Sequence, residues 1–157
     1  MLFTDEGVLM HKYGDQTPTG CLIPGEPGQH SQIVLYRHIR QGIRLKNVRI
    51  MLSAYDTSLS MQVMQHILGE PTPTNLKQSG RKSPSRLSPQ QSAVAYLYAQ
   101  VFEQTIAVFG TQKLAVEWLL RPCPYLEGSV PLVMVDNVLG YQVVRDYLSG
   151  IRYGVYQ

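Results

Sequence analysis

Cysteine and histidine are among the residue types that could act as nucleophile, general base or metal ligand. There are two cysteines, Cys21 and Cys123, and four histidines, which all precede residue 67. A cysteine nucleophile needs a neighbouring base, yet Cys123 lies between two prolines with no base nearby in the sequence. No zinc-type spacing, phosphate-binding loop or nucleophile-elbow motif occurs. The pattern predicts no metal, no cofactor and no enzymatic activity, and a small enzyme that uses Cys123 or a histidine stays an alternative.

Basic residues are concentrated in the middle of the chain. Residues 31–87 contain nine Lys and Arg residues against two acidic residues, whereas the formal net charge of the whole chain is only +3. A basic surface binds polyanions because each neutralised phosphate releases condensed counterions. The charge alone fits two interpretations equally well, a DNA-binding surface and a solvated basic surface.

Length and composition indicate an unexported protein with one core, or two small domains that share a core. The chain has 157 residues, of which 44% are hydrophobic. No apolar run approaches the roughly 18 residues needed to span a bilayer, and the N-terminus has Asp5 and Glu6 where a signal peptide would be basic. Two cysteines do not form a disulfide framework. We therefore expect a soluble, cytoplasmic protein with free thiols and no membrane partner.

The first half of the chain divides into an arm and a helical region. Residues 1–30 are rich in Gly and Pro, "TPTG" and "IPGEPG" are typical of turns, and "GVLMH" is the best candidate for a strand-like anchor. This arm has no core of its own and is expected to dock on its own domain or on a neighbour. From Gln32, helical spacing predicts helices over 32–42, 45–56 and 58–69, the last capped by Ser58. Such a bundle can hold a helix-turn-helix, and its predicted inward residues are Ile33, Tyr36, Ile39, Ile43, Val48, Met51, Leu52, Tyr55, Leu59, Val63 and Ile67.

The stretch "EPTPTNLKQSGRKSPSRLSP" after Gly69 is polar and basic, and a recognition helix would lie in it. Thr74 can cap a short helix over "NLKQ". Prolines on both sides limit that helix, so a plain linker is the alternative. The predicted DNA contacts are Thr74, Asn75, Lys77, Gln78, Arg81, Lys82 and Arg86.

Four further helices are expected after this stretch, over residues 88–110, 111–120, 131–140 and 140–154. Ser88, Pro89 and Thr111 supply N-terminal signals, and Gly110 ends the longest helix. Between the second and third, "VEWLLRPCPYLEGSVPL" is interpreted as a packing corner around Trp118. No hairpin signal occurs, so the predicted fold class is all-α. The predicted inward residues are Val94, Leu97, Val101, Phe102, Thr105, Ile106, Val108, Phe109, Leu114, Ala115, Trp118, Leu119, Val143, Val144, Tyr147, Leu148 and Ile151.

Three segments carry a resemblance to a known family. "VFGTQKLAVEWLLRPCPYLEGSVPLVMV", "LGYQVV" and "LSGIRYGVYQ" resemble the toxin-binding domain of the Xre/MbcA/ParS antitoxins, and "PTNLK" with "LSPQQS" is similar to the recognition turn and the helix start of the same proteins. The resemblance extends over residues 31–157 and is specific in the last fifty. It implies an Xre-like helix-turn-helix bundle over 31–87 and a small helical toxin-binding domain over 88–157, and the N-terminal arm over 1–30 lies outside it. The sequence "TNLKQSGRKSPSR" departs from the family in the recognition region.

The resemblance implies the antitoxin of a bacterial type II toxin-antitoxin system. Its partner would be a RES-domain toxin that consumes NAD, so that NAD is the substrate of the toxin and not a cofactor of this chain. The chain would bind its own promoter as a dimer and would block the toxin with its C-terminal end, through Arg152, Tyr153, Gly154, Val155, Tyr156 and Gln157. An alternative for the C-terminal end is that the tail folds back on its own bundle. An alternative for the function is a DNA-binding regulator without a toxin partner.

Overall fold

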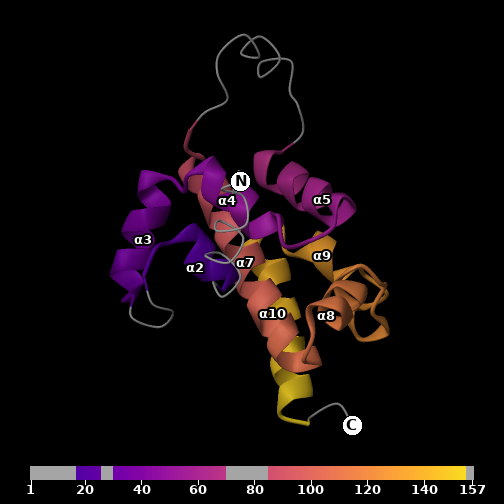
Figure 1. Ribbon diagram of the computed structural model, residues 1–157. Helices are drawn as coiled ribbons and strands as arrows, with labels where there is room; N and C mark the ends of the chain where they lie inside the picture. Colours follow the sequence, from indigo (N-terminus) through magenta and orange to yellow (C-terminus); the bar gives the residue numbers. More distant parts are fainter. Residues whose placement is uncertain (1–16, 26–29, 70–84, 155–157) are drawn as a thin grey trace, which may run out of the picture.

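A computed structural model describes residues 17–25, 30–69 and 85–154 of the chain (Figure 1). These residues form helices joined by short connections, and among them no strand occurs beyond two isolated bridges. The predicted all-α class is confirmed. None of the described helices is both long and apolar enough to cross a bilayer. The elements are α2 (Pro18–Leu22), α3 (Gln32–Gln41), α4 (Leu45–Leu52), α5 (Thr57–Leu68), α7 (Pro89–Phe109), α8 (Gln112–Leu119), the 3-10 helix η1 (Pro124–Leu126), α9 (Pro131–Met134) and α10 (Val138–Arg152).

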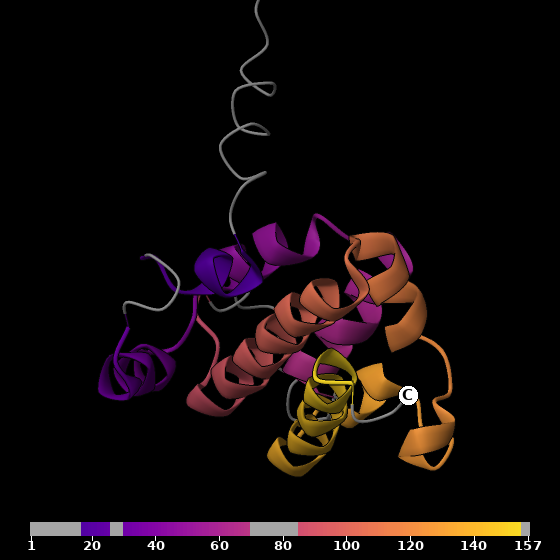
Figure 2. The same ribbon diagram turned by 90° about the horizontal axis from the view of Figure 1, so that it is seen from below.

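The 21-residue helix α7 is the centre of the molecule, with α3 on one side, α8 on another and α10 along it (Figures 1 and 2). Its start was predicted from local chemistry, and the capping box between Ser88 and Gln91 confirms that prediction. Helices from both halves of the chain pack against α7, and its buried residues share one side that is shifted from the predicted stripe. Val101, Phe102 and Thr105 are buried as predicted, whereas Val94, Leu97, Ile106, Val108 and Phe109 are only half-buried.

The predicted helices over 45–56 and 58–69 are present as α4 and α5, although α4 ends at Leu52, earlier than predicted. Val48, Met51, Leu52, Leu59, Val63 and Ile67 are buried as predicted, and Tyr55 is half-buried. The assignment of Ser58 as N-cap is wrong, because the Asp56 carboxylate accepts the Leu59 amide at 3.1 Å and α5 begins at Thr57. The four residues 53–56 join the two helices. That length suits a helix-turn-helix, which stays a prediction, as does the division between 31–87 and 88–157.

Helix α3 has the predicted bounds but not the predicted buried face. It lies at the edge of the molecule in both views and buries no residue (Figures 1 and 2). Ile33 and Tyr36 were expected to face the core and are instead 54% and 56% exposed. Only Ile43, beyond the end of the helix, is buried from the predicted stripe, and Ile39 is half-buried. The spacing predicted the helix correctly, but no described part of the chain covers its apolar face.

Residues 17–23 of the N-terminal arm dock on the helical body, as expected. The interpretation of "TPTG" as a turn is wrong, since the Thr17 side chain caps α2 and accepts the Gly20 amide at 3.2 Å. The amide and hydroxyl of Thr19 both donate to Oε1 of Glu103 on α7, at 2.8 and 2.5 Å. Leu22 and Ile23 are buried. The proposed anchor "GVLMH" lies outside the described residues.

The last helices surround the predicted corner. The Thr111 side chain caps α8 as predicted, but α10 begins at Val138 with Asn137 as its cap, before the predicted start at Gly140. Ala115, Leu119, Val144 and Leu148 are buried as predicted, and Trp118, Tyr147 and Ile151 are half-buried. Leu114 and Val143 were expected inside and are 48% and 47% exposed.

Candidate partner-binding site

The residues with possible catalytic chemistry take part in packing. His66 Nδ1 lies 2.5 Å from the Tyr98 hydroxyl, which donates to the Leu132 carbonyl at 3.0 Å. Because the hydroxyl has only one proton, His66 Nδ1 is the donor in the first contact. Cys123 is a buried free thiol whose amide donates to Ser129 O at 3.0 Å, and Cys21 is also a free thiol. Across the described ranges, no group of three or more His, Cys, Asp or Glu residues could hold a metal ion.

The end of α10 holds the part of the predicted toxin-binding segment that the structure describes. Helical hydrogen bonds continue to the Tyr153 amide, which donates to Ser149 O at 3.1 Å. Gly154 then takes φ 73°, in the left-handed region that favours glycine, so the chain leaves the helix axis here. Tyr153 is 79% exposed, and Arg152 is exposed as well. Val155, Tyr156 and Gln157 lie outside the described residues.

A small cleft lies beside this end. It has a volume of about 90 Å³ and is lined by Gln104, Val108, Leu148, Ser149, Arg152 and Tyr153. The Gln104 Oε1 atom is buried and accepts no hydrogen bond from the part of the chain that the structure describes. A buried acceptor of this kind is usually satisfied by water or by a ligand donor. The cleft has room for one small group only.

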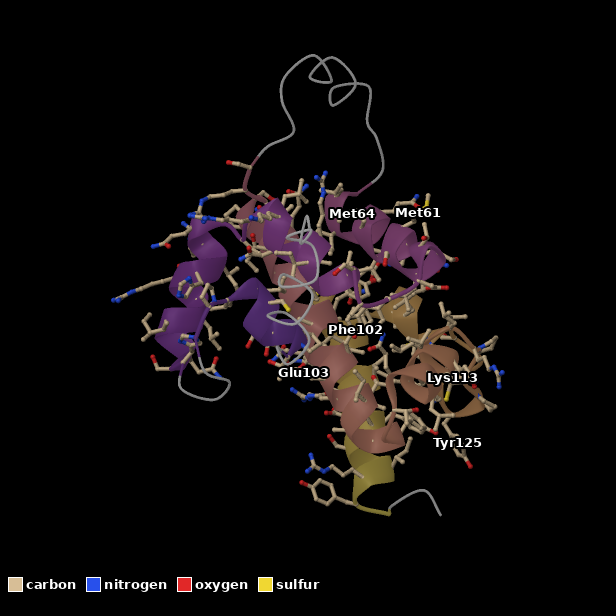
Figure 3. The ribbon with its side chains drawn as sticks, viewed as in Figure 1. Met61, Met64, Phe102, Glu103, Lys113 and Tyr125 are labelled. Atoms are coloured by element: carbon tan, nitrogen blue, oxygen red, sulfur yellow. The ribbon has the colours of Figure 1, made fainter. Side chains whose placement is uncertain are left out.

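A larger feature is an open groove of about 360 Å³ between α8, η1 and α10, which we call the aromatic groove. Trp118 stacks on Tyr147 with ring centroids 5.9 Å apart and an interplanar angle of 9°. Phe109 also packs against Trp118, with ring centroids 5.5 Å apart, and Tyr125 stacks on Tyr147 at 5.7 Å. The groove is lined by these four rings, Leu114, Glu117, Arg121, Pro122, Cys123 and Pro124. Tyr125 lies at its outer edge, on the side of the molecule away from α2 and α3 (Figure 3).

Sequence reasoning placed Trp118 inside a packing corner and missed the groove. The corner exists: Cys123 and Leu126 are buried, and Gly128 N donates back to Cys123 O at 2.9 Å. However, Trp118 packs against the core only at its margin and has one side on the groove. The four rings come from four segments of the chain, so no local pattern joins them. The sequence did offer one signal: there are more aromatic residues after Gly110 than predicted inward positions for them.

A basic surface covers α3 and α4. Arg37, Arg40, Arg44, Lys46 and Arg49 are all exposed, and Asp56 is the one acidic residue within residues 30–69. None of these five forms an ion pair with another residue that the structure describes. The basic surface therefore keeps its positive potential available to a polyanion.

Of the predicted DNA contacts, only Arg86 falls within the described residues. It is exposed and lies beside Arg44 in an isolated antiparallel bridge, and its guanidinium donates to Gly42 O at 2.7 Å. This contact holds the chain before α7 against the end of α3. Arg86 therefore adds its charge to the basic surface and has a structural contact as well. Thr74, Asn75, Lys77, Gln78, Arg81 and Lys82 lie outside the described residues.

Comparison with known families matches residues 104–154 to the antitoxin Xre/MbcA/ParS C-terminal toxin-binding domain. No curated protein matches the chain. The matched residues include α8, η1, α9 and α10, and with them the aromatic groove and the base of the C-terminal tail. The match confirms the family resemblance over these residues. It supports an antitoxin role in a toxin-antitoxin system and implies a toxin as the partner of this region.

Proposed function

We propose that this chain is the antitoxin of a bacterial type II toxin-antitoxin system and neutralises a RES-domain toxin that consumes NAD. The observation that carries the proposal is the match of residues 104–154 to an antitoxin toxin-binding domain. In this proposal the antitoxin performs no chemistry of its own. It inserts residues 152–157 into the active site of the toxin, so that NAD cannot enter.

The described end of α10 supports this role for the tail. Gly154 turns the chain away from the helix, and the Tyr153 ring offers a large rigid surface with a hydroxyl group. An aromatic residue has few rotatable bonds, so ordering it on a partner costs little conformational entropy. The exposed Arg152 can pair with an acidic rim of the toxin pocket. Val155, Tyr156 and Gln157 complete the proposed blocking segment.

We further propose that the antitoxin binds its own promoter and represses its operon as a dimer. The basic surface on α3 and α4 supports DNA binding, since it combines five exposed cations with no neighbouring acid in these two helices. The proposed base-contacting segment is residues 74–86, which follows this surface in the chain. One short recognition helix reads only a half-site, so a dimer is needed for a full operator.

The basic surface also fits a second function, that of a DNA-binding regulator without a toxin partner. It lies outside the matched residues, so promoter binding does not depend on the antitoxin assignment. The presence of a RES-type reading frame next to the gene separates the two functions. A regulator without a toxin needs no such neighbour.

Co-expression with the neighbouring RES-domain toxin tests the proposal in cells. The full chain should restore the growth of bacteria that express the toxin, whereas a chain without residues 153–157 should fail to do so at the same expression level. Far-UV circular dichroism and promoter binding of the truncated chain should match those of the full chain, which shows that only the tail function is lost. If the full chain does not restore growth, the antitoxin assignment is contradicted.

A further inference from the structure

The aromatic groove exposes apolar surface that the core of this chain does not use. Tyr125 is 67% exposed and Leu114 is 48% exposed at its edges, and the half-buried Trp118 forms part of its wall. Clustered aromatic rings in a depression are typical of the few residues that carry most of the binding energy in protein interfaces. The groove thus has the composition of a docking site.

Contacts within the chain hold the groove together without a partner. Its rings contact one another in a row, because Phe109 packs tilted on Trp118, Trp118 stacks on Tyr147, and Tyr147 stacks on Tyr125. The corner that supports Tyr125 is closed by hydrogen bonds from the amides of Leu126 and Gly128 to Cys123 O, at 3.0 and 2.9 Å. A preorganised surface loses little entropy on binding, so more of the contact energy appears as affinity.

The size and rim of the groove indicate what it binds. A volume of about 360 Å³ is at the low end for small-molecule sites, and the groove is open and mostly apolar in its lining. It therefore suits one or two apolar side chains projecting from a protein. At the rim, Glu117 and Arg121 form no ion pair with other described residues. They can pair with opposite charges beside those side chains.

We propose that the aromatic groove is the surface that holds the toxin, separate from the C-terminal segment that blocks its active site. The inference rests on the proposed function. All of the groove's lining residues lie within the matched toxin-binding residues 104–154. Tyr147 in the groove and Arg152 at the base of the tail are on the same helix, about 7.5 Å apart along its axis. One toxin molecule can therefore contact both, with affinity from the groove and inhibition from the tail.

Trp118 is the only tryptophan of the chain, so one fluorine label reports on the groove. The full chain is made with 5-fluorotryptophan and titrated with the unlabelled, catalytically inactive RES-domain toxin. The fluorine resonance should shift or broaden and saturate with the complex, and it should do so equally in a chain without residues 153–157. A resonance that stays unchanged while the complex forms overturns the inference.

Substitutions test the same surface by affinity. Tyr125→Ala and Leu114→Arg should each weaken toxin binding by about tenfold or more in calorimetry, the scale expected of interface anchors. Both positions are exposed, so circular dichroism should remain that of the parent, although Tyr125→Ala loses its stack on Tyr147 and should be somewhat less stable. Tyr36→Ala is the matched control, because Tyr36 is a similarly exposed tyrosine on α3, at the opposite side of the molecule (Figure 1). Parent-like binding by both groove variants overturns the inference.

Other occupants of the groove give different results, and each of them contradicts the inference. If the tail of the same chain fills it, deletion of residues 153–157 shifts the fluorine resonance before any toxin is added. If a second copy fills it, dilution of the free chain shifts the resonance, and Tyr125→Ala lowers the mass measured by light scattering.

The failure of this inference differs from the failure of the proposed function. If the tail is required for neutralisation while both groove variants bind like the parent, only the groove assignment fails. If the tail is dispensable while the groove variants lose binding, only the blocking mechanism fails. A toxin that does not bind the full chain at all contradicts both.

Discussion

Replacing Gly140 by Ala should destabilise the protein, although the substitution normally strengthens a helix. Gly140 lies in the first turn of α10, where its amide donates to the Asn137 side chain at 3.0 Å. A Cβ at this position would overlap the Met134 carbonyl oxygen, and it would lie 2.8 Å from the carbonyl carbon and 3.3 Å from Cα of Met134. These atoms are backbone atoms of α9, so they cannot rotate away. Either α9 or the start of α10 must move.

The expected magnitude follows from two opposing effects. Helix propensity favours Ala over Gly by about 1 kcal/mol in a helix interior. Overpacking costs about 1–3 kcal/mol, and displacement of the Asn137 cap adds about 1 kcal/mol. The net loss in the free energy of unfolding is therefore about 2 kcal/mol. For a domain of this size that corresponds to a decrease in Tm of about 4–8 °C.

Urea unfolding followed by far-UV circular dichroism measures this change. Gln142→Ala is the matched control on the same helix, because Gln142 is exposed and its replacement should alter stability by no more than about 0.5 kcal/mol. If Gly140→Ala melts at or above the temperature of the parent, the close packing of α9 on α10 is refuted.

Four further results are expected. Tyr98→Phe should cost about 1–3 kcal/mol in urea unfolding, because the buried Leu132 carbonyl loses its donor, and parent-like stability would contradict that contact. Burial raises the pKa of Tyr55 and of Tyr98 above the ordinary value of 10.0, so both stay protonated in the folded state. This contribution to the free energy of unfolding should be fully present below about pH 10 and should be lost as the pH rises further. The loss with pH should be less steep in Tyr98→Phe than in the parent, and equal slopes would refute the link between tyrosine burial and stability. Trp118→Ala should cost about 2 kcal/mol, less than the roughly 3–5 kcal/mol of a fully buried aromatic, and a parent-like melt would mean that the ring stack adds nothing. Replacing both Arg81 and Lys82 by Ala should weaken promoter binding and reduce the slope of log affinity against log salt concentration by about 2. Toxin neutralisation should stay unchanged, and equal loss of both activities would argue against separate sites.

Local chemistry made the helix boundaries predictable. Ser88, Thr111 and Gly110 act within their own turns, and the structure confirms each at its predicted place. Other boundaries were wrong. Asp56 replaced Ser58 as a cap, and Thr17 with Pro18 began a helix where a turn was predicted. The predicted helices over 45–56 and 131–140 end early, at Leu52 and Met134, and α10 starts before Gly140.

Contacts between distant segments could not be predicted in this way. The apolar spacing of α3 gave a correct helix, but it could not show that Ile33 and Tyr36 are exposed. Leu114 and Val143 were misplaced for the same reason. The docking of α2 depends on a hydrogen bond between Thr19 and Glu103, which are 84 residues apart. The aromatic groove brings together four segments, whose proximity only the fold establishes.

The most direct test of the antitoxin assignment is the rate of NAD consumption by the purified RES-domain toxin as the chain is added. The full chain should abolish NAD consumption with a sharp end point at a fixed ratio of chain to toxin. A chain without residues 153–157 should still form the complex through the groove yet leave NAD consumption largely intact. Complete inhibition by the truncated chain at the same ratio would contradict the blocking role of the tail, and no inhibition by the full chain would contradict the antitoxin assignment.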